Sequence, residues 1–207
     1  MFKINKVIKV LILSDFLLQA GWGLIGPLFA IFLIGQIEGG SLELVGLVTA
    51  VYWIFKSLLQ PFIANYLDIN HGERDDFAFL VGGMFIANLV PLGYVFSTQA
   101  WHIVILELIR AVAMACVIPT WSAIFTRHVD RGREAFSWSL ESAGIGLAAG
   151  IAGALGAIMV SLFGFKVVFV LVSVFGIMSS ISLLAMRRSI FRRGRAASRP
   201  SVEKPNL

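Results

Sequence analysis

The sequence predicts an all-α integral membrane protein with six transmembrane helices. Hydrophobic residues make up 58% of the 207 residues, charged residues only 14%, and the mean hydropathy is +0.87. A soluble domain would not tolerate this composition on its surface. Six stretches are each long enough to cross a hydrocarbon core of about 30 Å as a helix. Basic residues occur mainly in every second connection between these stretches, as in membrane proteins that insert with one orientation.

The six predicted spans are joined by short connections, so neighbouring helices should run antiparallel. Glycine, asparagine and serine residues mark the joins. The first apolar run continues to Ile34 without a small-residue cleavage site, which indicates a retained span rather than a signal peptide. We therefore expect a transmembrane domain over residues 1–186, with spans at 7–35, 42–66, 77–97, 102–126, 138–162 and 165–186.

The basic residues indicate which way the chain crosses the membrane. Of the 17 Lys and Arg residues, 14 fall in four segments that would share one side, and the opposite side receives only Lys166. The positive-inside rule then places both termini in the cytoplasm. The basic tail, residues 187–207, has too little apolar surface to fold, and we expect it to be disordered against anionic lipid headgroups. The net charge of +5 therefore indicates lipid, not nucleic acid.

A weak internal repeat relates the first and fourth spans. Asp15 and Pro27 are twelve residues apart, as are Glu107 and Pro119, and an aromatic residue follows each proline by two positions. The first span starts inside and the fourth starts outside. The pattern therefore predicts two three-helix units of opposite orientation, which is an inverted 3+3 repeat.

Three groups of residues share a pattern with a known family. They are the run at 14–18 (SDFLL) with Pro27, the series Lys56, Pro61 and Asp68 leading into Gly72, and the run at 131–135 (RGREA) before a glycine-rich fifth span. Together they resemble the N-terminal six-helix half of the major facilitator superfamily, from residue 7 to about residue 188. The resemblance implies a secondary transporter.

The loop after the second span departs from the signature of that family, Gly-x-x-x-Asp-basic-x-Gly-basic-basic. Asp68 is kept, Ala64 replaces the first glycine, Ile69 replaces a basic residue, and Gly72 comes one position late. In the family this loop latches two halves together on the cytoplasmic side. The resemblance therefore implies a gating role for Asp68, Gly72 and Arg74.

The family commonly has twelve helices in two halves, whereas this chain matches one half. Two copies with both termini inside could pair in parallel as a homodimer. A separate six-helix chain could also supply the second half, and a truncated gene product is the third alternative.

Ionisable residues inside a span cost several kcal/mol, about 2.5–3.5 at the helix centre, so each needs a partner or a water-filled cavity. In the first span, one face holds Asp15, Gln19, Trp22 and Gly26, and we expect it to line a transport pathway. Lys56 has no acidic neighbour in its own span. A partner for Lys56 must come from another span, and Asp15 lies at a compatible depth; snorkelling of Lys56 to the membrane interface is the alternative. Glu141 is expected at the membrane interface.

The fourth span carries Glu107 and Arg110, which are three residues apart and can meet on one helix face. Met114 and Trp121 continue that face. We predict that Arg110 faces the bundle interior and contacts Glu107 or a group from another span. The family often has an arginine here at its proton-coupling or substrate site, so the resemblance implies a transport role. A purely structural pair is the alternative.

The fifth span has a small-residue face at three- and four-residue spacing, which lets helix backbones approach closely in lipid. In the family this helix lies along the contact between halves. We therefore expect helix packing or a half-to-half interface at Gly146, Gly150, Gly153 and Gly156.

The sequence offers no pattern for an enzyme, a cofactor or a metal site. Its histidines lie at predicted loops or span edges, the single Cys116 excludes a disulfide within the chain, and there is no P-loop glycine run. We predict secondary active transport of a small molecule by alternating access, coupled to protons, by a half-transporter that needs a second six-helix unit. The alternatives are a non-transporting membrane scaffold with structural ion pairs and a truncated inactive transporter.

Overall fold

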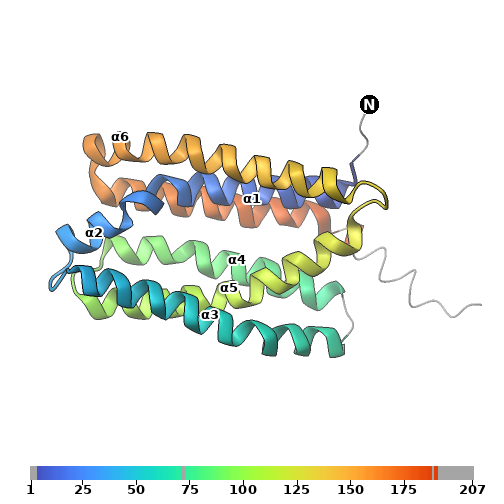
Figure 1. The fold of residues 1–207 in the computed structure, drawn as a ribbon, viewed down its shortest axis with the longest axis horizontal. Coiled ribbons are helices and arrows are strands. Elements are labelled where there is room, and N and C mark those ends of the chain that lie inside the picture. The colour runs from blue at the N-terminus through green and yellow to red at the C-terminus, as the bar shows by residue number, and fades with distance from the viewer. Residues whose placement is uncertain (1–3, 71–72, 188, 191–207) are drawn as a thin grey trace, which may run out of the picture.

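The computed structural model describes residues 4–70, 73–187 and 189–190, and within them every regular element is a helix (Figure 1). Five segments are long and apolar enough to cross a membrane. The predicted all-α membrane class is therefore confirmed. In chain order the elements are α1 (Lys6–Ile25), the 3₁₀ turn η1 (Gly26–Leu28), α2 (Phe29–Gln36), α3 (Leu42–Asn70), α4 (Glu73–Val95), α5 (Ala100–His128), α6 (Glu134–Leu183) and the 3₁₀ turn η2 (Leu184–Met186).

The first segment is a helix interrupted at Pro27. Proline lacks a backbone N–H, and its ring clashes with the carbonyl group four residues earlier. The α-helix therefore stops at Ile25, and one 3₁₀ turn precedes α2. At its other end α1 begins after Asn5, whose side chain accepts a hydrogen bond from the Val7 N–H at 3.0 Å. The interruption places Gly26 and Pro27 in the wall of a cavity.

The last segment, α6, has 50 residues and consists of two helices that meet at Gly164. At 1.5 Å per residue one straight helix of this length would be about 75 Å long, far more than a bilayer core needs. Gly164 has φ 77° and ψ 169°, a conformation open to glycine but not to most residues. The chain reverses there, and residues 165–183 run back beside the rest of the bundle (Figure 1).

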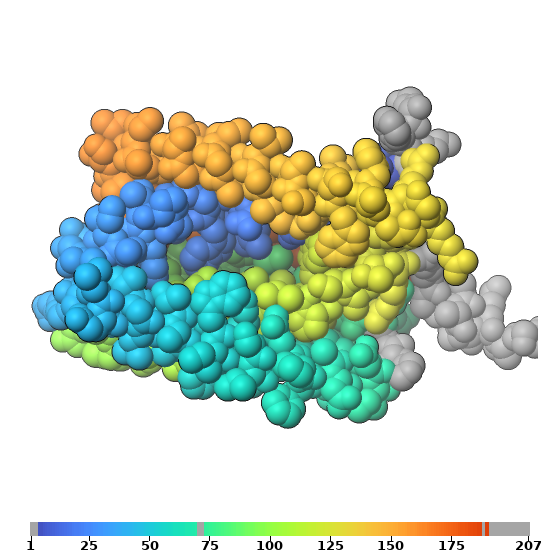
Figure 2. Space-filling model, viewed as in Figure 1, coloured from blue at the N-terminus to red at the C-terminus, as the bar shows by residue number. Residues whose placement is uncertain are grey.

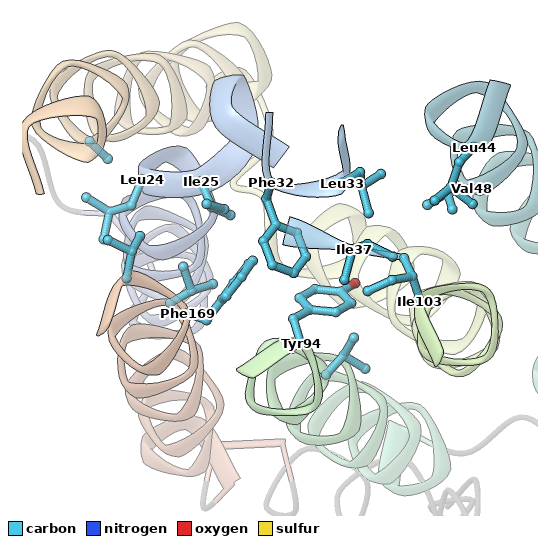
Figure 3. Packing of buried hydrophobic residues seen from close by; sticks show 14 residues of the cluster. Leu24, Ile25, Phe32, Leu33, Ile37, Leu44, Val48, Tyr94, Ile103 and Phe169 are labelled. Carbon is cyan, nitrogen blue, oxygen red and sulfur yellow. The ribbon is translucent and has the colours of Figure 1, made fainter. Parts of the chain in front are cut away.

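The helices pack as two connected groups. α1 lies mainly against α6, α3 against α5, and α4 bridges the groups through α5 and α6. Near one end of the bundle, aromatic rings fill the centre (Figure 3): Phe32 of α2 meets Phe169 of α6 edge to face at 4.7 Å between ring centroids. Tyr94 of α4 lies 5.2 Å from the same Phe169 ring. This core holds the ends of α1, α2, α4 and α6 together around the interior.

The outer surface carries many large apolar side chains, among them Leu42, Phe62 and Trp53 on α3 and Leu147 on α6. Such a surface suits a lipid environment or another protein. Figure 2 shows that it is hollowed between the first half of α6 and α3, with α1 and α5 at the bottom of the hollow.

The glycine face of α6 contacts α1 at one end only. A Cβ on Gly156 would lie 1.9 Å from the carbonyl oxygen of Leu24, so glycine is required for this close approach. A Cβ on Gly153 would lie at an ordinary distance, 3.8 Å, from Gly23 and Pro27. A Cβ on Gly146 or Gly150 would meet nothing within 4 Å among the described residues. The predicted role in helix packing therefore has a visible counterpart at Gly156, and a half-to-half interface stays a prediction.

The helical backbone continues beyond the predicted end of the domain at residue 186. Arg187, Ser189 and Ile190 are helical, and Ile190 is buried against the core. Residues 188 and 191–207, which hold nearly all of the predicted disordered tail, lie outside the described residues.

Candidate functional site

A cavity of about 430 Å³, here called the main cavity, lies between α1, α3, α5 and the first half of α6. The α1 face predicted from the sequence supplies much of its wall, because Gln19, Trp22 and Gly26 line it. α5 contributes Arg110 and Met114, and α3 contributes Tyr52. The structure thus brings together residues from the first, second and fourth predicted spans.

An ion pair on α5 places one charged group, the guanidinium of Arg110, in the wall of the main cavity. As predicted, Arg110 contacts Glu107: its Nε donates to the two carboxylate oxygens at 3.1 and 2.9 Å, and its Nη2 donates to Oε2 at 2.5 Å. The hydroxyl of Tyr94 donates a further hydrogen bond to Oε1 of Glu107. The side chain of Glu107 is 1% exposed and that of Arg110 is 18% exposed. The carboxylate is therefore enclosed, while the guanidinium faces the cavity.

Aromatic rings cover the guanidinium of Arg110. Its Cζ lies 3.7 Å from the ring centroid of Tyr52 and 4.7 Å from that of Trp22. Each ring attracts the cation through its negative face, by about 0.5–2 kcal/mol. The two rings come from α3 and α1, so Arg110 joins three helices through its charge. Neither ring was predicted as a partner of Arg110, because i, i+3 spacing reveals contacts within one helix only.

Lys56 does not contact Asp15, contrary to our expectation. It is 5% exposed, and its Nζ lies 3.5 Å from the Trp53 ring centroid and 5.0 Å from that of Tyr52. α3, which carries Lys56, packs mainly on α5, whereas α1, which carries Asp15, packs mainly on α6. Similar depth in the membrane therefore does not place the two side chains in contact. Lys56 is held by the aromatic rings of its own helix.

A second, smaller cavity of about 170 Å³, here called the acidic cavity, adjoins the main cavity through shared wall residues Leu18, Gln19 and Met114. Its wall contains Asp15 of α1 and Glu141 of α6. Glu141 therefore lies at a cavity rather than only at the membrane interface, where the sequence placed it. Trp121 also lines the acidic cavity, and its ring stacks on Phe125 with centroids 4.7 Å apart. Residues of the first and fourth predicted spans thus line both cavities.

A buried amide that the sequence did not single out ties the helices together beside the main cavity. Asn88 of α4 is fully buried, and its Nδ2 donates to the Gly176 carbonyl at 3.0 Å and to Ser180 Oγ at 3.4 Å. Its Oδ1 accepts a hydrogen bond from Trp22 Nε1 at 3.4 Å. A polar residue within a predicted span is a signal for such a network. These bonds hold the indole of Trp22 beside Arg110.

The predicted gating role of Asp68, Gly72 and Arg74 stays a prediction. Asp68 is an exposed residue in the last turns of α3, which extends to Asn70, and Arg74 is exposed in the first turn of α4. Gly72 lies outside the described residues. The charged contact seen at this end joins Asp76 of α4 to Arg127 of α5. It ties two helices of the same bundle together.

No group of three or more His, Cys, Asp or Glu side chains among the described residues could hold a metal ion. The site consists of two adjacent cavities that share wall residues, with buried charged groups, inside a bundle whose outer surface is apolar. This combination defines a polytopic membrane protein with a polar interior rather than a simple membrane anchor.

Comparison with known proteins agrees with that class. Residues 11–206 match the family model of the Major Facilitator Superfamily. The chain is also 23% identical over 196 residues to the uncharacterized MFS-type transporter MJ1560 of Methanocaldococcus jannaschii. That alignment covers 94% of this chain and 49% of the relative, so the chain spans about half the length of the curated relative that it matches. The chain belongs to the major facilitator superfamily, and its membership supports a transporter.

Proposed function

We propose that the chain is half of a secondary transporter that moves a small molecule by alternating access, coupled to proton movement. The observation that carries this proposal is that charged groups line two adjacent cavities within one membrane bundle: Arg110, paired with the buried Glu107, lines the main cavity, and Asp15 and Glu141 line the acidic cavity. Charged groups at this depth are costly in lipid, and they are retained where they bind ions or substrates. A protein that only anchors or scaffolds needs no such cavity.

The proposed topology has six crossings with both termini in the cytoplasm. Two observations support it. The 14 basic residues assigned to one side outnumber the single Lys166 on the other, and α6 consists of two helices that meet at Gly164 and would supply the fifth and sixth crossings. The proposed tail contact with anionic lipid follows from the same orientation.

Thiol labelling tests this topology in a Cys116→Ala background. An impermeant reagent should label Thr98→Cys and Lys166→Cys from the outside and Asp130→Cys only after the membrane is opened. All three native residues are exposed, so access to each is not limited by packing. Labelling of Lys166→Cys only from the inside would remove the sixth crossing.

The transport cycle needs a second six-helix unit to close the other side of the main cavity. The hollow between α3 and α6 and the unoccupied glycine positions Gly146 and Gly150 supply a surface for it. A second copy of this chain, a separate chain, or more of the same polypeptide could provide the unit. Particle mass in lipid nanodiscs distinguishes a homodimer from a single chain, and a strict monomer that transports would contradict the proposal.

Proton coupling would use carboxylates that the cavity exposes alternately to the two sides. Asp15 and Glu107 are the candidates, since they occupy matching places in the proposed inverted 3+3 repeat. The test is a panel of small molecules offered to proteoliposomes that contain a pH-sensitive dye. A substrate should move protons across the membrane in proportion to its own uptake. Uptake without any proton movement would leave transport but exclude coupling.

A further inference from the structure

The wall of the main cavity carries positive charge only. Among the described residues that line it, Arg110 is the one charged residue, and the polar uncharged side chains are Gln19, Trp22 and Tyr52. The hydroxyl of Tyr52 forms no hydrogen bond within the described part of the chain. A ligand in this cavity therefore meets a guanidinium and a free hydroxyl, and it meets no carboxylate of the described wall.

Arg110 is held in a fixed orientation with donors to spare. Glu107 occupies the Nε edge of the guanidinium, and the rings of Tyr52 and Trp22 cover it. Among the described residues, Nη1 donates no hydrogen bond. An arginine has five N–H donors in a rigid fork that matches a carboxylate. Glu107 is 1% exposed and does not line the cavity, so the remaining N–H groups of Arg110 suit an anion there.

Lys56 adds a second positive charge beside this site. Its Nζ lies 5.0 Å from the ring centroid of Tyr52, the same ring that lies 3.7 Å from Cζ of Arg110. Lys56 forms no ion pair with a described carboxylate. Glu107 balances only one of the two cations. The group of Arg110, Glu107 and Lys56 therefore carries one net positive charge when all three are ionised.

The charge of Lys56 needs compensation in this environment. Its side chain lies within a membrane-spanning helix and is 5% exposed, so little water reaches it. Unbalanced charges at such depth are costly, and they mark substrate or ion pathways. The rings of Tyr52 and Trp53 offset part of the cost. Lys56 does not line the main cavity, so it would act on a ligand through its charge, whereas Arg110 would make the contact.

The size and the remaining wall of the main cavity indicate what else the ligand carries. Its volume of about 430 Å³ falls in the range of small-molecule sites, roughly 300–1,000 Å³. Leu18, Pro27, Ala87 and Met114 give it apolar surface. One net positive charge is balanced by one carboxylate. A phosphate monoester, with a charge of about −1.5 to −2 at pH 7, would leave an excess of negative charge.

We propose that the main cavity binds a small organic monocarboxylate with an apolar body. The carboxylate accepts hydrogen bonds from the free N–H groups of Arg110 and from the hydroxyl of Tyr52. The apolar body lies against the apolar wall, and Lys56 supplies the charge that the carboxylate balances. An organic cation would meet two like charges here. This assignment rests on the proposed transport function and names its substrate class.

Binding of matched compounds to the full chain in lipid nanodiscs, with empty nanodiscs subtracted, tests the assignment without any substitution. The carboxylates are hexanoate, benzoate and 3-phenylpropionate. Each is compared with its uncharged amide (hexanamide, benzamide, 3-phenylpropanamide) and with an amine of the same skeleton (hexylamine, benzylamine, 3-phenylpropylamine). For the best skeleton the carboxylate should bind at least about ten-fold more tightly than the amide or the amine.

Three results of this series would overturn the assignment. They are failure of every carboxylate to bind, equal binding of an amide or an amine, and tighter binding of phenyl phosphate than of benzoate. The last result would indicate a phosphate site instead of a site for a single carboxylate.

Substitutions of Lys56 test its part in the site. Lys56→Met should weaken binding of the carboxylate by about ten-fold or more and leave binding of the amide unchanged, because the amide has no charge. Lys56→Arg keeps the charge and should keep carboxylate binding. Lys166→Met is the matched control, since it removes the same charge at an exposed position. Unchanged carboxylate binding in Lys56→Met, or an equal loss of carboxylate and amide binding, would overturn the charge-balancing role.

Uptake separates this assignment from the proposed function. Carboxylates that bind with the expected charge preference but never accumulate in proteoliposomes would support the site and contradict transport. Accumulation of an amine or an uncharged compound, unaffected by Lys56→Met, would support transport and overturn the monocarboxylate site.

Discussion

Replacing Arg110 by methionine should destabilise the bundle and abolish transport, whereas replacing Arg110 and Glu107 together should restore stability without restoring transport. Glu107 is 1% exposed, so Arg110→Met leaves its carboxylate buried with only Tyr94 as a partner. Removing one member of a buried ion pair costs about 3–5 kcal/mol, while replacing both members with uncharged residues is often neutral. The free energy of unfolding, measured by denaturant titration in mixed micelles, and uptake in proteoliposomes report the two effects separately.

The control is Lys166→Met, which makes the same kind of change at an exposed position and should alter neither stability nor uptake. Transport by the double variant Glu107→Gln/Arg110→Met at the wild-type rate would show that the pair is structural. That result would favour the alternative in which the buried charges only hold α5 to its neighbours.

Asp15→Asn should abolish proton-driven accumulation of substrate while leaving exchange of substrate across the membrane partly intact. The amide has the shape of the carboxyl group but cannot ionise, so it removes proton exchange with little change in packing. Asp15 lines the acidic cavity with Glu141 and has no ion-pair partner among the described residues, so no partner is left uncompensated. Accumulation under an imposed proton gradient and counterflow exchange without a gradient are the two measurements.

Asp130→Asn serves as the control, because Asp130 is an exposed carboxylate in the connection before α6. It should support accumulation and exchange as the wild-type chain does. Unchanged accumulation in Asp15→Asn would remove this residue from coupling, and loss of exchange together with expression would indicate a structural role instead.

The class of the protein and the positions of its helices were predictable because they depend on local sequence. Apolar length sets where a chain can cross a bilayer. The predicted spans fall within the five segments observed, except that the span at 77–97 extends two residues past Val95. The break in α6 at Gly164 falls between the last two predicted spans, and its positive φ is a conformation at which helices commonly end. The contact between Glu107 and Arg110 followed from their i, i+3 spacing alone.

Contacts between different helices could not be predicted in the same way. The expected contact between Lys56 and Asp15 was inferred from their similar depth in the membrane. Depth alone does not determine which helices are neighbours or how each helix is rotated about its axis. The structure places Lys56 on the aromatic rings of α3 and places Glu141, not Lys56, in the cavity with Asp15. Tyr94 and Asn88 were missed for the same reason, because their partners lie 13 and 66 or more residues away in the chain.

The sequence by itself therefore determined that this is a helical membrane protein, where its helices lie, and that Arg110 has its counter-ion one turn away. Each of these depends on hydrophobic length or on the 3.6-residue period of a single helix. Only the tertiary structure decided that Asp15 and Glu141 share a cavity and that Tyr52 and Trp22 cover Arg110. In lipid, helix neighbours and rotations are selected by close packing of small residues such as Gly156 against Leu24, and that selection involves the whole bundle at once.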